Sequence, residues 1–415
     1  MAGTSACSGR LLSVNFERRG GLGGTIASGT GLRVLAIGLL SFFAGTSALS
    51  QQMEAWPRIR VAGIAEVVLE ASKMNCADGD EQNIDVPDMP PSAFRRSDGR
   101  VVMLASNKNN FVLDGPSLDE VARSRCASLL TSAHDADPAE FRDNEWLLAV
   151  LMASNGRAVG LVHDEYHGEE HDVPSCPRLI SEDRECWYAA TTIVASNDGG
   201  RSFSRPVAPS NVIAALPYAF QAGLKRAGTS APKALMNPRD GFLYVMVTFV
   251  DRNRKIGARQ CLLRASPQNP MEWLAWDGGE FSQHVGSAYA TRKSPDCVSV
   301  LSANVMSVKY LPRYKLFVAI STTRERLEYR FSNDLVRWSK PQLLETFQSF
   351  TDYAGGPENP LWYFSLLDPS SGSPNFDTLE GRPYLYFVRF HTEGRKLINR
   401  KRDIMRVAVT IDPPT

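Results

Sequence analysis

The segment EWLLAVLMASNGRAVGLVHDE, residues 145–165, carries the strongest short hairpin signal in the chain. Two apolar runs flank Asn155-Gly156, and both of these residue types tolerate the positive φ angles of a two-residue hairpin turn. The segment therefore predicts two antiparallel strands, residues 145–154 and 157–165, joined by a tight turn.

The same unit, a strand followed by a turn and a second β-rich strand, recurs four more times. The other copies are residues 91–106, 233–250, 303–321 and 362–390. A repeated small sheet cannot bury its own faces, so the units must pack against one another. Radial packing leaves only short, protected edges. The predicted fold class is therefore all-β, a five-bladed β-propeller of antiparallel sheets, with a two-layer β-sandwich as the alternative.

Composition fits a globular chain without nucleic acid as a partner. Of 415 residues, 43% are hydrophobic and 22% are charged, which is enough for a full core. The net charge of +1 shows no basic excess. The propeller is assigned to residues 88–415, a length acceptable for one large all-β unit. Residues 51–87 form an N-terminal extension, in which residues 64–71 are expected to fill the edge of the first blade and close the ring.

The first fifty residues resemble an export signal rather than part of the fold. Arg18, Arg19 and Arg33 precede an apolar run over residues 34–44, and Ala48-Leu49-Ser50 fits a small-x-small cleavage site. The run is short for a bilayer span. Residues 1–50 are therefore predicted to be a cleaved signal peptide, which implies a secreted or periplasmic protein without a membrane partner after cleavage. Twin-arginine export and an uncleaved anchor are the alternatives.

Six cysteines remain once Cys7 is removed with the signal. An even number after an export signal favours disulfides. Sequence alone does not fix their connectivity, and we expect neighbours along the chain to pair. A zinc site is the rival, but paired Cys-x-x-Cys spacing is absent, so no metal and no cofactor are expected. The expected pairs are Cys76–Cys126, Cys176–Cys186 and Cys261–Cys297.

Two turn segments narrow the architecture. In SNDGGRSF, residues 196–203, Asp198 can accept turn amides, the glycines allow positive φ and the final aromatic can plug between sheets. SNDLVRWSKP, residues 332–341, is a glycine-free version. The first resembles the Asp-box turns of sialidases and related propellers. The second is similar to a segment common in five-bladed glycoside hydrolases of the arabinanase and invertase kind. In those families such turns are structural, which implies no catalytic role for Asp198 or Asp334.

This resemblance covers roughly residue 88 to the C-terminus and implies where a site would lie. Ligands of the five-bladed hydrolases bind over the central channel, where the innermost strand of each blade starts and the second strand ends. The segment DMPPSAF, residues 88–94, resembles the start of their first blade, where an Asp acts as general base, so Asp88 is the base candidate. Their general acid is a Glu on the third blade. Here residues 221–237 contain no acid, only Lys225, Arg226 and Lys233, so either another blade supplies the acid or the protein does not hydrolyse glycosides.

The densest group of reactive side chains is HDEYHGEEHD, residues 163–172. On a strand, His163, Glu165 and His167 would share one face. A carboxylate beside histidines suits proton transfer or sugar binding, and the set could also hold a metal. The remaining interpretation is a solvated polar loop with Tyr166 packing beneath it.

These considerations give a set of candidates around one rim. Several arginines are expected at this rim, and a guanidinium group can donate two parallel hydrogen bonds to a carboxylate or a sulfate. This favours an acidic glycan as the ligand. The predicted function is that of a secreted, glycoside hydrolase-like protein acting on a glycan, and the alternative is a non-catalytic propeller that binds a glycan or a protein. The sequence does not set the oligomeric state. The catalytic candidates are Asp88, Glu165, Glu358 and Asp164, and the substrate-binding candidates are Asn107, Asn110, His163, His167, Arg324, Arg389 and His391.

Overall fold

The computed structural model describes residues 56–76, 85–105, 107–123, 125–153, 156–176, 185–290, 295–354, 359–394 and 396–414. The export signal expected at residues 1–50, the turn residue Asn155 and the candidate Glu358 lie outside the described residues. Within the described part of the chain, no helix is long and apolar enough to cross a membrane.

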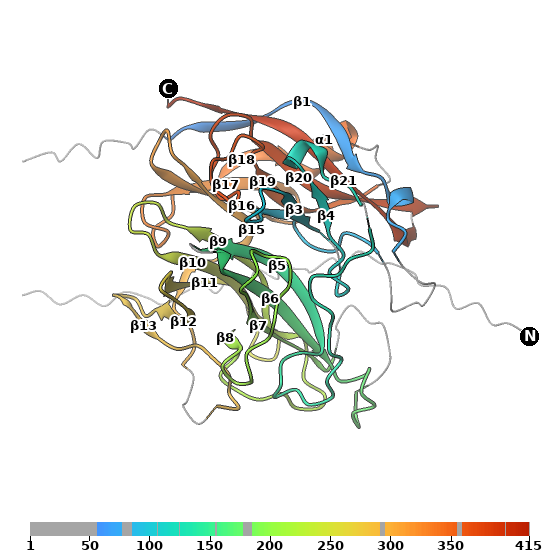
Figure 1. The fold of residues 1–415 in the computed structure, drawn as a ribbon, viewed down its shortest axis with the longest axis vertical. Helices are drawn as coiled ribbons and strands as arrows, with labels where there is room; N and C mark the ends of the chain where they lie inside the picture. Colours follow the sequence, from blue (N-terminus) through green and yellow to red (C-terminus); the bar gives the residue numbers. More distant parts are fainter. Residues whose placement is uncertain are drawn as a thin grey trace, which may run out of the picture. The chain divides into compact units, whose positions relative to one another are not determined.

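Nearly all of the regular structure is β-strand, and the strands form five successive antiparallel units (Figure 1). The first three units follow the chain from residue 92 to residue 301. The first unit contains β2 (Ser92–Arg95), β3 (Val101–Leu104) and β4 (Leu113–Gly115). The second contains β5 (Asn144–Met152), β6 (Ala158–His167), β7 (Trp187–Ser196) and β8 (Val212–Ala214). The third contains β9 (Ala227–Met236), β10 (Leu243–Asp251), β11 (Ile256–Ser266), β12 (Asn269–Trp276), β13 (Phe281–Gln283) and β14 (Ser299–Leu301).

The last two units bring the two ends of the described chain into one sheet. The fourth contains β15 (Asn304–Leu311), β16 (Leu316–Thr322), β17 (Arg326–Ser332) and β18 (Gln342–Thr346). The fifth contains β19 (Leu361–Leu367), β20 (Tyr384–Glu393), β21 (Lys396–Asp412) and β1 (Arg58–Leu69). The helices are short: α1 (Phe347–Ala354) and the 3₁₀ turns η1 (Ala71–Lys73) and η2 (Leu118–Glu120).

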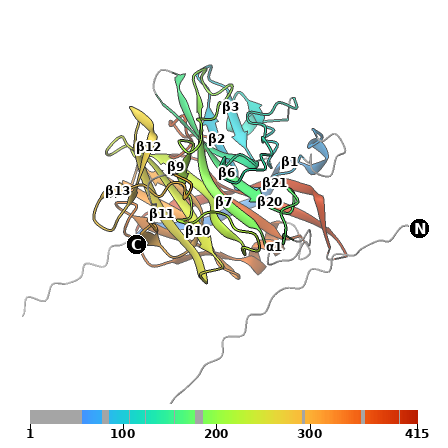
Figure 2. The same cartoon turned by 90° about the horizontal axis from the view of Figure 1, so that it is seen from below.

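The first strands of the five units contact one another in a closed circle. β2 contacts β5, β5 contacts β9, β9 contacts β15, β15 contacts β19, and β19 returns to β2. Figure 2 shows the strands of the second and third units running next to one another from β6 to β12. A circle of five inner strands is a five-bladed propeller, so the predicted fold class is confirmed and the two-layer sandwich is excluded for the described residues.

β1 joins the fifth blade, whereas the sequence analysis expected this segment at the edge of the first blade. It pairs antiparallel with β21, from Arg58 opposite Asp412 to Leu69 opposite Ile404, and Figure 1 shows it in blue beside the red β21. The expectation that residues 64–71 edge the first blade is therefore wrong. β21 would otherwise present a long unpaired edge, whereas the outer strand β4 already bridges to Ala122.

The core lies between neighbouring sheets. One apolar cluster joins the second and third sheets through residues such as Leu161 and Val245, and another joins the fourth and fifth through Val318 and Phe387. β5 and β6 are buried at every position, because adjoining sheets cover both of their faces. Continuous apolar runs rather than strict alternation are therefore the sequence signal of these inner strands.

All three expected disulfides are present. Cys76–Cys126, Cys176–Cys186 and Cys261–Cys297 have Cα separations of 5.1, 5.6 and 5.9 Å, each within the range of an ordinary disulfide. Each bridge links cysteines that are neighbours along the chain, as the sequence analysis expected. Disulfides of this kind persist in oxidising compartments, which is compatible with a secreted protein.

Candidate functional site

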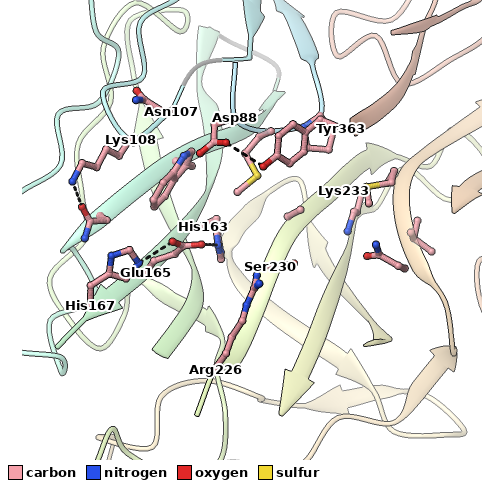
Figure 3. Close-up of a pocket in the computed structure, with 18 of the residues that line it drawn as sticks. Asp88, Asn107, Lys108, His163, Glu165, His167, Arg226, Ser230, Lys233 and Tyr363 are labelled. Atoms are coloured by element: carbon pink, nitrogen blue, oxygen red, sulfur yellow. Dashed lines mark hydrogen bonds and ion pairs between the residues drawn. The ribbon is translucent and has the colours of Figure 1, made fainter. Parts of the chain in front are cut away.

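The starts of the inner strands surround a cavity of about 650 Å³ (Figure 3). Residues of all five blades, or of the loops next to their strands, line it, because each inner strand starts at this face of the ring. The lining residues are Asp88, Met89, Pro90, Asn107, Lys108, Asn144, Trp146, His163, Glu165, His167, Glu170, Arg226, Ser230, Ala231, Lys233, Asn304, Val305, Met306, Tyr363 and Arg402.

Glu165 stands between two histidines at the end of β6 that lines the cavity. The strand pairs residue by residue with β7 from Ala158 to His167, so its side chains alternate regularly. The carboxylate of Glu165 accepts from Nε2 of His163 at 2.7 Å and from Nε2 of His167 at 3.0 Å (Figure 3). The period-two expectation that these three side chains share a face is met in the geometry.

Aromatic rings enclose this array. The His163 imidazole centre lies 5.8 Å from the Trp146 ring and 6.2 Å from the Trp187 ring. The Arg226 guanidinium stacks over the Trp187 ring at 4.2 Å. These side chains bury the base of the array, where His163 is 1% exposed, and charge interactions are stronger at a buried position.

The charges of the array support one another. Burial alone would raise the pKa of Glu165, but the hydrogen bonds from His163 and His167 hold that pKa well below its usual value. Burial alone would lower the pKa of His167, but its hydrogen bonds to Glu165 and Glu170 raise that pKa to about 10. At neutral pH this part of the cavity therefore holds an ionised glutamate and a protonated histidine.

A polar network extends the array along the cavity wall. Glu170 accepts from Nδ1 of His167 at 3.2 Å and from the Asn144 amide at 3.0 Å. Lys108 donates to the Asn144 side-chain oxygen at 2.6 Å. Burial would raise the pKa of Glu170, but His167, Asn144 and Lys108 lower it to about 2. Glu170 is thus a second ionised carboxylate of the cavity.

Asp88 approaches the cavity from the loop before β2. The Tyr363 hydroxyl donates to its Oδ1 at 3.1 Å, and Arg402 pairs with the same oxygen. Arg402 in turn stacks over the Phe390 ring at 4.4 Å, which holds the guanidinium in place. The Asp88 side chain keeps 28% of its surface exposed, so it remains open to a molecule in the cavity.

Five of the sequence candidates come together here: Asp88, Asn107, His163, Glu165 and His167 all line the cavity. Their chain positions are separated by up to 79 residues between Asp88 and His167. The convergence follows from the ring, which places the loop before β2, the loop after β3 and the end of β6 at one face.

Two other candidates are buried beside the cavity rather than in it. Asp164 falls on the opposite face of β6, and its Oδ1 accepts from the Asp143 amide at 2.9 Å. Burial, with nearby carboxylates, raises the pKa of Asp164 well above its usual value. Asn110 has φ 52° and uses its amide on the backbone of Leu130 and Glu145, at 2.9 and 2.8 Å. Both positions are those of structural side chains.

The remaining described candidates lie outside the cavity lining. Arg324 and Trp362 line a separate depression of about 570 Å³. This depression shares two lining residues, Asn304 and Met306, with the main cavity. Arg389 and His391 both contact the buried carboxylate of Asp403, at 2.6 and 2.7 Å, and so form a partly buried polar cluster between β20 and β21.

Some lining residues were not among the sequence candidates. Propeller topology places four of them at the cavity face, so their positions along the chain were enough to predict them: Lys108, Asn144, Arg226 and Lys233. Tyr363 and Arg402 had no such signal. Tyr363 takes φ 61° at an irregularity in the β19–β20 pairing, and Arg402 arrives on a third strand through its pairing with Phe390.

The two turn segments lie away from the cavity. β7 starts opposite His167 at the cavity face and ends at Ser196, so the turn around Asp198 follows its far end. Asp198 Oδ1 accepts from the amides of Arg201 and Ser202, each at 3.0 Å. Asp334 Oδ1 likewise accepts from the amides of Val336 and Arg337. These contacts order turns and leave neither aspartate at the cavity.

No protein-family model and no curated protein matches the sequence. Solved structures match most of the chain at low identity. A thermostable family-43 glycoside hydrolase matches with TM-score 0.46 and 12% identity, over 82% of this chain and 96% of its own. A family 117 glycoside hydrolase from the marine bacterium Zobellia galactanivorans matches with TM-score 0.47 and 9% identity, over 86% and 91%. An endo-arabinase from Bacteroides thetaiotaomicron matches with TM-score 0.42 and 9% identity, over 84% and 97%.

All three of these neighbours bear the names of glycoside hydrolases. The five-bladed architecture follows independently from the circle of strand contacts. The activities in those names are those of the neighbouring proteins.

Proposed function

We propose that this protein binds a glycan in the central cavity and hydrolyses a glycosidic bond there. The observation that carries the proposal is the convergence of Asp88 with the His163–Glu165–His167 array in one cavity of about 650 Å³. Glycosidic cleavage requires a carboxylate on one side of the scissile bond and a proton donor on the other. A cavity of this size admits one or two sugar rings.

Asp88 is proposed as the group that activates water. It is open to the cavity, and Tyr363 and Arg402 fix the orientation of its carboxylate. A general base must be held within hydrogen-bond reach of the water that it deprotonates. Holding one carboxylate oxygen with two donors leaves the other oxygen of Asp88 directed to that task.

Glu165 is proposed to orient the proton donor rather than to be the donor. Its low pKa means that Glu165 has no proton to give at neutral pH. The protonated His167 donates to Glu165 and Glu170, and the longer of these contacts, from Nδ1 to Glu170 at 3.2 Å, is the one proposed to open so that Nδ1 delivers its proton to the leaving oxygen. This arrangement would replace the third-blade glutamate that the sequence lacks.

An acidic glycan is the proposed substrate class, and secretion is the proposed location. Lys108, Arg226 and Arg402 line the cavity, and guanidinium groups suit sugar carboxylates or sulfates. The predicted signal peptide together with three disulfides supports export. We also propose that the turns at Asp198 and Asp334 are of the Asp-box kind.

The second candidate function is glycan binding without catalysis. It is favoured by the third sheet, whose contribution to the cavity is Arg226, Ser230, Ala231 and Lys233, without a carboxyl group. A cavity with several cations and no carboxyl group on its third blade suits recognition of an anion as well as catalysis.

A panel of neutral, uronate-containing and sulfated oligosaccharides tests the proposal, with product release and binding measured separately. The wild type should cleave an acidic member of the panel. Asp88→Asn should lower kcat by about 10²–10⁴-fold with little change in KM, because it removes a group used only in the chemical step. Asp198→Asn, a change of the same kind in a turn away from the cavity, should keep activity.

The outcomes separate the two functions. Binding by the wild type without turnover of any bound glycan would refute hydrolysis and leave the recognition role. Full activity in Asp88→Asn would refute the assignment of the base. If no glycan binds at all, both functions fail.

A further inference from the structure

Four side chains with metal-ligand chemistry gather beside the cavity, at the start of β5 and in the turn that follows β6. His134, Asp143 and Glu170 offer ligand atoms that all lie within 4.8 Å of one another. Nδ1 of His134 lies 3.8 Å from Oδ1 of Asp143. Nε2 of His171 lies 2.9 Å from the other oxygen of Asp143. Of the four residues, Glu170 alone lines the cavity.

Asp143 gives an independent reason to expect a ligand. Its residue is 1% exposed, yet Oδ1 has no hydrogen-bond donor among the described residues. An unsatisfied buried carboxylate oxygen is costly. A cation at Oδ1 would relieve this penalty.

We propose that His134, Asp143, Glu170 and His171 form a binding site for one divalent transition-metal ion of the Zn²⁺ type. Two imidazoles and two carboxylates suit such an ion, whereas Ca²⁺ prefers ligands that are all oxygen. With metal–ligand bonds of about 2.0–2.2 Å, two ligands of one ion lie roughly 3–4 Å apart. The two side chains that must move inward are the exposed ones, His134 at 47% and Glu170 at 32%.

Glu170 is the weakest of the four ligands. Its oxygens already accept from His167 and Asn144, so water can replace it without breaking the set. The other three residues come from the loop before β5 and from the turn after β6. The ion would therefore tie that turn, which is continuous with His167, to the base of β5.

This site differs from the sequence expectation of no metal, and it stands apart from the proposed hydrolysis. A structural ion here fixes one wall of the cavity whether the cavity cleaves a glycan or only binds it. Loss of metal binding would therefore leave the proposed function intact, and failure of the glycan panel would leave the metal site intact.

The test is calorimetric titration of Zn²⁺ into full-length mature protein stripped with a chelator, with Co²⁺ absorption as a second readout of coordination. The wild type should bind one equivalent. His134→Ala, an exposed position that spares the fold, should weaken binding at least tenfold, as should Asp143→Asn if circular dichroism shows it folded. His284→Ala, a histidine outside the cluster, is the matched control and should bind as the wild type does.

Two results would overturn the proposal. One is the absence of saturable Zn²⁺ binding by the folded wild type. The other is binding by His134→Ala with unchanged affinity, because that would place the ion elsewhere. Weakened binding in His284→Ala but not in His134→Ala would count against it in the same way.

Discussion

At the scale of single residues, two buried lysines lie at or near the cavity. Lys233 lines both the cavity and a smaller pocket of about 50 Å³, Lys309 lines that smaller pocket, and the amine of each donates to one neutral acceptor. Nζ of Lys233 donates to Thr248 at 2.8 Å, and Nζ of Lys309 donates to the Phe376 carbonyl at 2.8 Å. Burial lowers the pKa of Lys233 to about 7 and that of Lys309 to about 8. These side chains cost stability that the fold tolerates.

The lysine at position 233 gives a prediction about pH. Its folded pKa of about 7 lies below the unfolded value of 10.5, so between these limits the unfolded state binds more protons. The resulting penalty is fully present below about pH 7 and disappears as the pH rises through the unfolded pKa. Lys233→Met should raise the free energy of unfolding by roughly 2–4 kcal/mol at pH 7, with a smaller gain at pH 9.

Urea unfolding at pH 7, 8 and 9 measures this difference between variant and wild type. Lys340→Met, at an exposed lysine, is the control and should change stability by less than about 0.5 kcal/mol at every pH. If the increase in unfolding free energy caused by Lys233→Met does not become smaller from pH 7 to pH 9, the lowered pKa of Lys233 is contradicted.

At this scale, alternation along a strand was enough to predict that His163, Glu165 and His167 share a face. The same alternation places Asp164 on the opposite face of β6, away from the cavity. Tyr363 and Arg402 could not be predicted, since their positions depend on an irregular pairing and on the register of a distant strand. Arg389 and His391 were expected at the rim, but a buried partner, Asp403, holds both of them.

At the scale of elements, the junction of the second and third blades depends on one glycine. β7 and β9 pair in parallel through Tyr188 with Ala227 and Ala189 with Gly228. Gly228 has φ 138°, and a Cβ there would lie 2.2 Å from the Ala189 carbonyl oxygen. No other residue type allows the two backbones to approach this closely.

Gly228→Ala should therefore reduce the free energy of unfolding by about 2–4 kcal/mol, through overpacking and an unfavourable backbone angle. Chemical denaturation gives the value. Gly257→Ala is the matched control, because that strand glycine has no heavy atom within 4 Å of an added Cβ. Equal stability of the two variants would show that the junction is not as tight as described.

The pairing of inner strands was accessible from sequence, and the pairing of the closing strand was not. Hairpins join residues that are close along the chain, so their turns and apolar runs identify them, as do cysteines that pair with a chain neighbour. β1 and β21 are separated by more than 300 residues, and only ring closure brings them together. A local pattern carries no information about such a partner.

At the scale of the whole molecule, β1 ties the last blades together. Besides pairing with β21, it donates from the Ile59 amide to the Tyr329 hydroxyl in the fourth blade at 3.2 Å. The Trp56 ring, just before β1, stacks on Phe331 of the same blade at 5.8 Å. A single segment therefore spans two blades and covers an edge that would otherwise pair with another chain.

Truncation tests this role of β1. A chain that starts at Trp56 should fold as the mature protein does. A chain that starts at Glu70 lacks β1 and should lose several kcal/mol of stability and tend to aggregate, because burial of Ile59 and Leu69 is lost and the edge of β21 is exposed. Thermal unfolding and size-exclusion chromatography measure both effects. Equal melting temperatures of the two chains would contradict the role of β1 in closing the ring.

The central claim is that distant chain segments meet at one face to make a glycan site. A crystal structure of Glu165→Gln with an oligosaccharide that the wild type binds tests it most directly. We expect the sugar in the central cavity, between Asp88 on one side and residue 165 on the other. A structure in which Asp88 and His163 lie on opposite sides of the molecule, or in which the sugar binds outside the cavity, would contradict the account.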